Sequence, residues 1–334
     1  MTATPLPNAN PAPVATPNRF RSLRNLITSQ EGILLLVIIV VMVVVGANKE
    51  RFRAPNNLLD IFQSEAYVAV AAVGMSILII SGNIDISVGS LVGVLAILSA
   101  TMSVNGFPGW LCWLVPIVVS MFVGAINGFF VAYLRIPSIV VTLGMLSILK
   151  GGSIIVLGGT TIIKMQPDFF LSQWDWLGVP SPIWLMIIAT IIGALWMRYS
   201  STGRSIYAVG GNAEAARLSG INTRRITMTA FIINGLCVGV CAIMYATQLN
   251  SLQASPPVAL ELRVITASVV GGVSILGGIG TVVGSTLAAI LLSVIRSAMI
   301  FVDIPASWIN AVRGSLILVT VLVDIFRRRR LNRR

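Results

Sequence analysis

The chain has 334 residues, of which 56% are hydrophobic and only 10% are charged. Because soluble domains carry roughly a quarter charged residues, this composition excludes an ordinary soluble protein and indicates an integral membrane protein. The formal net charge of +12 lies mainly at the ends of apolar runs, which is typical of spans held by anionic lipid rather than of a protein that binds nucleic acid.

Apolar runs long enough to cross a bilayer as helices recur along the chain, without the alternating pattern of transmembrane strands. The predicted fold class is therefore all-α and polytopic, with about ten transmembrane helices, some of them broken at Gly-rich segments. We expect these spans near residues 31–48, 63–82, 86–104, 110–134, 138–157, 182–198, 226–248, 262–276, 280–301 and 308–326.

Three regions differ in composition. Residues 1–30 begin with a stretch rich in Pro, Ala and Asn, which predicts a disordered N-terminal extension. Residues 31–326 form the transmembrane domain, and residues 327–334 form a basic tail. Arginines precede the first span and fill the tail, and positive charge is retained on the inner side. We therefore expect a multi-pass protein with both termini in the cytoplasm.

Two segments interrupt the helical pattern at membrane depth: ISGNIDISVGSL at 80–91 and GGVSILGGIGTVVGS at 271–285. Irregular backbone is tolerated there only where it is buried in protein or faces a watery cavity. An acid at this depth is also costly enough to need a partner or a functional reason. The candidate residues of a substrate pathway are polar side chains in or near the membrane: Asn83, Asp85, Ser87, Asn127 and Asn310.

A structural interpretation of these polar residues stays open. The Asp85 carboxylate can accept backbone N–H groups or cap the helix that begins at Ile86, without contacting substrate. Asn127, Asn234 and Asn310 can equally form hydrogen bonds between helices. These residues then shape a pathway without lining it.

The longest polar interruption is YSSTGRSIYAVGGNAEAARLSGINTRRI, residues 199–226. It is rich in arginine and contains a single acid, Glu214, so we expect it on the cytoplasmic side. Asn212 is placed to cap a short helix that begins near Ala213 and stops at Gly220. Such a helix is either a docking site for a soluble partner or a surface helix without one.

A second polar group is expected toward the outer ends of the last two spans. It consists of Arg296, Asp303 and Arg313, with Asp303 and Arg313 facing each other across the turn DIPAS. One interpretation is a salt bridge that locks the last helical hairpin. The other is a role in lining the substrate exit or in contacting an external partner.

Four motifs together resemble the permease subunits of bacterial ABC importers for monosaccharides, a group that handles ribose, xylose, galactose and rhamnose and includes the autoinducer-2 permeases. They are NIDISVGSLVG at 83–93, IPSIVVTLGM at 136–145, GRSIYAVGGNAEAARLSGIN at 203–222 and GGVSILGGIGTVVGS at 271–285. The resemblance covers residues 31–326 in order. One departure is Asn83 after Gly82, where many members have Gly-Gly or Arg-Gly.

The resemblance implies a transport subunit that works as a homodimer or heterodimer in the bacterial inner membrane. It also implies a cytoplasmic ABC ATPase and a periplasmic substrate-binding protein as partners. The ATPase-coupling loop then includes Gly203, Arg204, Ala208, Gly210, Gly211, Asn212, Glu214, Ala215, Ala216, Gly220 and Ile221.

The chain contains no GxxxxGK[ST] phosphate loop, so we expect it to bind neither ATP nor Mg²⁺, which belong to the partner ATPase. Its cysteines lie in apolar runs without metal-ligand spacing, and it has no histidine, so we expect no metal site and no enzyme active site. The cargo expected is a monosaccharide or a sugar-like molecule such as autoinducer-2. The alternative function is a secondary transporter driven by an ion gradient, for which Asp85 would be essential.

Overall fold

A computed structural model describes residues 29–157, 161–253, 257–305 and 307–331. The described chain is all-α apart from four two-residue strands, as predicted. Its α-helices are α2 (Gln30–Asn48), α3 (Pro55–Ser64), α4 (Ala66–Ile80), α5 (Val88–Val104), α6 (Gly109–Ala132), α7 (Ser138–Leu157), α8 (Ser181–Tyr199), α9 (Ser201–Gly211), α10 (Ala213–Leu218), α11 (Thr223–Gln248), α12 (Leu260–Val270), α13 (Val282–Phe301) and α14 (Ser307–Leu331).

Seven helical segments of the described chain are long and apolar enough to cross a membrane, with α3 and α4 forming one of them. Helix α5 and the part of α14 from Trp308 to Leu322 are shorter apolar helices. The span expected at 262–276 is wrong in its bounds, because α12 has only 11 residues. At 1.5 Å per residue this helix is about 16 Å long, roughly half the apolar thickness of a bilayer. The polytopic all-α fold is thus confirmed, while the count of ten spans is not.

Both predicted Gly-rich segments are breaks between helices. The first break, residues 81–87, separates α4 from α5, and the second, residues 271–281, separates α12 from α13. In the second break Gly277 and Gly278 have φ values of +82° and +75°. Glycine adopts this left-handed backbone without the steric cost of a Cβ atom, which is why the chain turns there.

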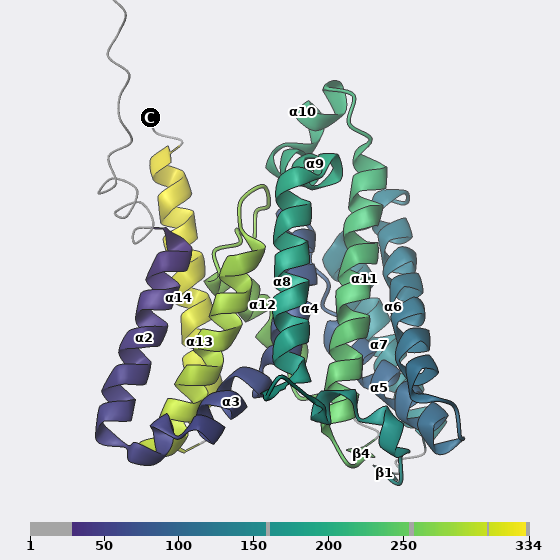
Figure 1. Ribbon diagram of the computed structural model, residues 1–334. Helices are drawn as coiled ribbons and strands as arrows, with labels where there is room; N and C mark the ends of the chain where they lie inside the picture. Colours follow the sequence, from purple (N-terminus) through teal and green to yellow (C-terminus); the bar gives the residue numbers. More distant parts are fainter. Residues whose placement is uncertain (1–28, 158–160, 254–256, 306, 332–334) are drawn as a thin grey trace, which may run out of the picture.

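Helix α4 forms the centre of the molecule. All 15 of its residues are buried, and α8, α11, α12 and α13 pack around it (Figure 1). A helix with partners on every side needs no polar face, which explains why its sequence is almost entirely apolar. Ser76 of α4 also joins the two helices that flank the second break, because its Oγ lies 3.1 Å from Ser268 Oγ of α12 and 2.5 Å from Ser285 Oγ of α13.

Helices α6 and α11 pack through two facing GxxxG motifs. A Cβ atom added at Gly124 of α6 would lie 2.6 Å from the Phe231 carbonyl oxygen, and one at Gly235 of α11 would lie 2.6 Å from the Ser120 carbonyl oxygen. Gly128 and Gly239 complete the two motifs. Small residues at this spacing let helix backbones approach closely, so packing replaces the hydrophobic effect that lipid does not supply.

One end of the molecule carries α9, α10, the beginning of α2 and the end of α14 (Figure 1). The opposite end carries α3 and the small sheets, in which β1 (Thr161–Ile162) pairs with β4 (Leu252–Gln253) and β2 (Asp175–Trp176) pairs with β3 (Val179–Pro180). The 3₁₀ helices are η1 (Glu50–Arg53), η2 (Pro167–Phe169) and η3 (Leu171–Gln173). Most of the predicted extension at 1–30 and the end of the tail at 327–334 lie outside the described residues, and α14 continues through Leu331.

The contact between α6 and α11 gives a stability prediction. We expect Gly235→Ala to lower the free energy of unfolding by about 1–3 kcal/mol, because the added methyl group overpacks the contact with Ser120. Gly144→Ala on α7 is the control, since a Cβ atom there meets nothing within 4 Å. Thermal unfolding of the detergent-solubilised proteins measures both, and equal melting temperatures would contradict this packing.

Candidate functional site: a surface helix pair joined to the membrane breaks

Helices α9 and α10 form a helix pair that projects from one end of the molecule (Figure 1). The predicted helix after Asn212 is confirmed, since Asn212 Oδ1 accepts a hydrogen bond of 2.9 Å from Ala215 N at the beginning of α10. Gly220 has a φ of +84° just beyond the end of this helix. Helix α9 was not predicted. The sequence signal for this helix is the N-cap residue Ser200, whose side chain accepts a hydrogen bond of 2.8 Å from Gly203 N.

Helix α10 is almost entirely exposed. Only Ala216 is buried, whereas the Leu218 side chain is 77% exposed. Glu214 and Arg217 form an ion pair of 2.6 Å on the surface. The hydrogen bond and charge of Arg217 lower the pKa of Glu214, so this carboxylate is ionised at neutral pH. An exposed apolar side chain beside a fixed ion pair is suited to contact another protein.

Helix α9, in contrast, is fixed to the membrane-embedded chain. Its inward face consists of Gly203, Ile206 and Val209, all of them buried. Gly203 lies so close to the end of α8 that a Cβ atom there would be 2.5 Å from the Met197 carbonyl oxygen. Substitution of this glycine with any larger residue therefore requires α8 and α9 to separate.

The C-terminal end of α9 contacts both membrane breaks at once. A Cβ atom at Gly210 would overlap the carbonyl oxygen of Ile80, the last residue of α4, and would lie 2.8 Å from Gly278 N. Gly278 N in turn donates a hydrogen bond of 2.8 Å to the Ile80 carbonyl oxygen. Tyr207 of α9 donates a further hydrogen bond of 2.8 Å to the Gly280 carbonyl oxygen. The surface helix pair and the two breaks therefore form one connected structure.

A buried polar cluster lies at the first break. Asp85 Oδ1 accepts hydrogen bonds from Ser87 N at 2.9 Å and Ser87 Oγ at 2.6 Å, and Asp85 Oδ2 accepts one from Asn234 Nδ2 at 3.0 Å. Asn127 Nδ2 reaches Ser87 Oγ at 3.4 Å. All four side chains are buried. Because both oxygens of the acid accept hydrogen bonds, the cluster offsets the cost of burying Asp85 and fastens the break to α6 and α11.

The structure thus brings together three of the five candidate pathway residues, Asp85, Ser87 and Asn127. Asn83 lies apart from them, lining the hollow described next. Asn310 is exposed on α14, which packs against α12 and α13 rather than against α6 or α11. Asn234 was predicted only to form hydrogen bonds between helices. In the structure its side-chain amide donates a hydrogen bond to the Asp85 carboxylate.

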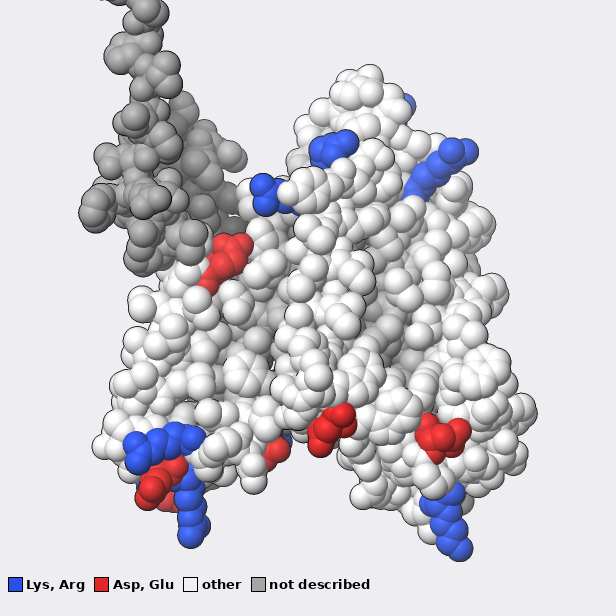
Figure 2. Space-filling model, viewed as in Figure 1, with Lys and Arg blue, Asp and Glu red and all other residues white. Residues whose placement is uncertain are grey.

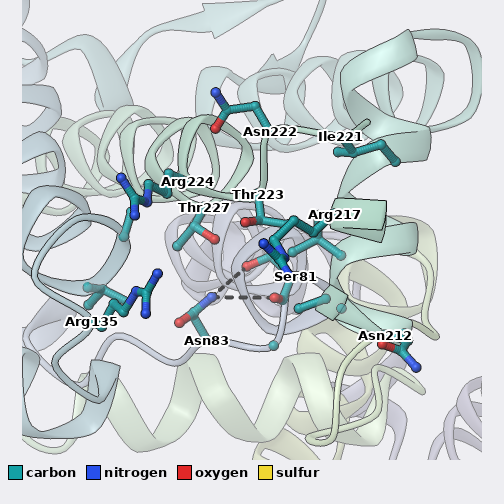
Figure 3. Close-up of a pocket in the computed structure, with 17 residues that line it drawn as sticks. Ser81, Asn83, Arg135, Asn212, Arg217, Ile221, Asn222, Thr223, Arg224 and Thr227 are labelled. Atoms are coloured by element: carbon teal, nitrogen blue, oxygen red, sulfur yellow. Dashed lines mark hydrogen bonds between the residues drawn. The ribbon is translucent and has the colours of Figure 1, made fainter. Parts of the chain in front are cut away.

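A hollow of about 730 Å³ opens between the helix pair, α6 and the first break. Figure 3 shows Arg135, Arg217 and Arg224 around it, with Asn83 on one wall. Figure 2 shows basic side chains on the outer surface of this end of the molecule, and others beside acidic side chains at the opposite end. Such a concentration of one sign of charge attracts an acidic surface and matches the predicted cytoplasmic position.

The predicted outer-end polar group has a different acid at its centre. Arg296 and Arg313 lie 3.7 Å and 3.6 Å from Glu65 Oε1, and Arg263 pairs with Glu65 Oε2 at 2.5 Å. Among the described residues no ion pair joins Asp303 to either arginine, so the expected hairpin bridge is wrong. Helix α4 packs against α12 and α13, and α14 packs against the same two helices. This packing brings Glu65 to arginines about 200 to 250 residues away, which a search for neighbouring charges does not find.

The family described as "Branched-chain amino acid transport system / permease component" matches residues 57–321. The chain belongs to this family of permease components. It is 34% identical over 305 residues to the autoinducer 2 import system permease protein LsrC of Yersinia enterocolitica. The aligned region covers 91% of this chain and 84% of that relative. It is also 34% identical to the LsrC protein of Photorhabdus luminescens (79% and 80% covered) and 32% identical to that of Salmonella typhi (90% and 87% covered).

These comparisons confirm the resemblance to importer permeases. The matched region runs from α3 into α14, so it contains both breaks and the helix pair. The permease is therefore a multi-pass membrane protein that serves as the transport component of its system.

The Glu65 cluster gives a second stability prediction. We expect Glu65→Gln to lower the free energy of unfolding by about 3 kcal/mol, because three guanidinium groups then lose their buried counter-charge. Asp303→Asn is the matched control and should leave stability unchanged. Thermal unfolding in detergent compares the two, and the interpretation fails if Asp303→Asn is the more damaging substitution.

Proposed function

We propose that the permease is the transmembrane subunit of an ATP-driven ABC importer in the bacterial inner membrane. Its cargo is a small neutral sugar-like molecule, and the names of the relatives make autoinducer-2 the first candidate. Membership of the permease-component family supports transport as the function. The end that carries α9, α10, the beginning of α2 and the end of α14 faces the cytoplasm, where basic residues are retained.

One observation carries this proposal: α9 contacts both membrane breaks while α10 is free to contact a partner. A cytoplasmic ATPase docks on the exposed face of α10, including Glu214 and Leu218. Closure of the ATPase pair moves α10, and α9 passes the displacement to Ile80 and Gly278 through Gly210. Since each break has a helix on either side, this displacement switches the pathway between outward and inward access.

The remaining partners follow from the two other surfaces. A second permease subunit, identical or a sister chain, packs on the membrane-facing side of this one. Helix α7 offers an apolar face for it, with Ile148 and Ile155 exposed to 69% and 83%. A periplasmic substrate-binding protein docks at the end that carries the small sheets. ATP and Mg²⁺ belong to the ATPase, since this chain has no phosphate loop.

The secondary transporter is the weaker candidate. Ion coupling through Asp85 needs a carboxylate that faces a wet pathway and changes its protonation. Here Asp85 is buried and accepts hydrogen bonds from Ser87 and Asn234. This arrangement supports a structural role in the first break.

The docking face gives a prediction on complex formation. In membranes that also contain the cognate ATPase, we expect Leu218→Asp combined with Glu214→Lys to weaken the complex by at least about tenfold, because both the apolar contact and the charge are changed. Asp175→Lys, on the opposite end of the molecule, is the control. Co-purification and ATP-dependent uptake measure the effect. Normal assembly and uptake in the double variant would count against α10 as the docking site.

The link through α9 gives a sharper prediction, because two adjacent glycines differ in their surroundings. Gly210→Ala drives a methyl group into Ile80, whereas Gly211→Ala meets nothing within 4 Å. We expect Gly210→Ala to bind the ATPase normally and to import about tenfold more slowly, the scale of an ordinary coupling free energy. Gly211→Ala should import normally. Equal uptake by the two variants in proteoliposomes would contradict transmission through Gly210.

A further inference from the structure

A separate cavity of about 290 Å³ lies among α5, α7 and α12, away from the helix pair. It is lined by Ser90 of α5, by Leu146 and Lys150 of α7, by Glu261 in the first turn of α12 and by Val258 just before that helix. Its volume is near the lower limit of small-molecule sites, and its wall combines apolar side chains with a few polar groups, as such sites do. None of these side chains belongs to the predicted pathway residues.

The two charged groups of the cavity have no partner within the described chain. Neither the Glu261 carboxylate nor the Lys150 ammonium group forms a hydrogen bond or an ion pair with a described residue. Charged side chains at membrane depth ordinarily pair or mark a pathway. Because the two charges are opposite, the cavity presents both a strong acceptor and a strong donor while its net charge is zero.

The local backbone positions Glu261 in this cavity. Its carboxylate lies directly against Gly89, where any Cβ atom would overlap the Oε2 atom. Gly89 belongs to the first turn of α5, and the positive end of a helix favours a carboxylate there. On the other side, Ala259 adopts a left-handed φ of +50° immediately before α12. A strained non-glycine residue of this kind is typical of ligand sites.

The cavity is also connected to both membrane breaks. Ser90 Oγ donates a hydrogen bond of 2.9 Å to the carbonyl oxygen of Ser87, which is part of the buried cluster at the first break. Helix α12, which begins beside Glu261, ends at the second break. A displacement of the breaks therefore moves the walls formed by α5 and α12 relative to the wall formed by α7.

We propose that this cavity is a transit site for a neutral polyhydroxylated molecule, an inference that rests on the proposed import function. The Glu261 carboxylate accepts hydrogen bonds from two neighbouring hydroxyl groups. Lys150 donates hydrogen bonds to further hydroxyl oxygens, Ser90 Oγ accepts one from a hydroxyl group, and Leu146 and Val258 contact the C–H face of the ring or chain. A phosphorylated sugar is excluded, because its charge would be repelled by Glu261 and only partly offset by Lys150.

Ligand protection of an introduced cysteine tests the site on the full-length permease. Val258 is 86% exposed, so Val258→Cys should react with a membrane-impermeant methanethiosulfonate reagent, while the native Cys112, Cys237 and Cys241 are buried. We expect ribose or autoinducer-2 to slow the labelling at least fivefold and ribose 5-phosphate to leave it unchanged. Adding Glu261→Gln should abolish the protection. Labelling that neither neutral probe slows overturns the transit site.

Uptake by the complete complex separates this inference from the proposed function. In proteoliposomes with the cognate ATPase and binding protein, we expect Glu261→Gln to raise the apparent KM or lower the rate of uptake at least tenfold. Co-purification should show an intact complex, and Asp175→Asn is the control. If the wild-type complex imports the sugar and the Glu261→Gln complex imports it equally fast, the transit site is overturned. If the neutral probes protect the Val258→Cys variant from labelling but the wild-type complex hydrolyses ATP without import, the transit site stands and the import function fails.

Discussion

The structure depends on one constraint, which is that backbone polar groups freed inside a membrane must find partners within the protein. The two breaks satisfy part of this requirement through each other, since Gly278 N donates to the Ile80 carbonyl oxygen. Helix α9 supplies another partner, because Tyr207 donates to the Gly280 carbonyl oxygen. The surface helix pair is consequently joined to the membrane-embedded structure at both breaks.

Helix α4 has contacts at both ends of the molecule. Its last residue, Ile80, contacts α9 and the second break, and the residue before its first turn, Glu65, binds three arginines of α12, α13 and α14. Because α4 is buried along its whole length, it cannot shift without repacking its neighbours. A packed core of this kind changes between discrete arrangements rather than bending gradually, which is what alternating access requires.

The arrangement also separates the roles of the polar side chains. Asp85 accepts hydrogen bonds from Ser87 and Asn234 in a buried cluster, which Asn127 joins through Ser87 and which fastens the first break. Glu261 and Lys150, by contrast, face a cavity. In the proposed transit site Glu261 and Lys150 are available to a solute, whereas the Asp85 carboxylate is already bonded within the protein. This distinction comes from the contacts and not from residue type.

Membrane class, the helix that begins after Asn212 and the two Gly-rich breaks could be predicted from the sequence alone, because each depends on composition or on residues a few positions apart. Asn212 caps a helix by bonding to a residue only three positions away. The acid that binds Arg296 and Arg313 could not be predicted, and the choice of Asp303 was wrong, because only tertiary packing brings Glu65 to them. The contact of Gly210 with Ile80 and the meeting of Glu261 with Gly89 were likewise decided by the tertiary structure. Helix packing alone determines which distant residues become neighbours, and no local preference encodes it.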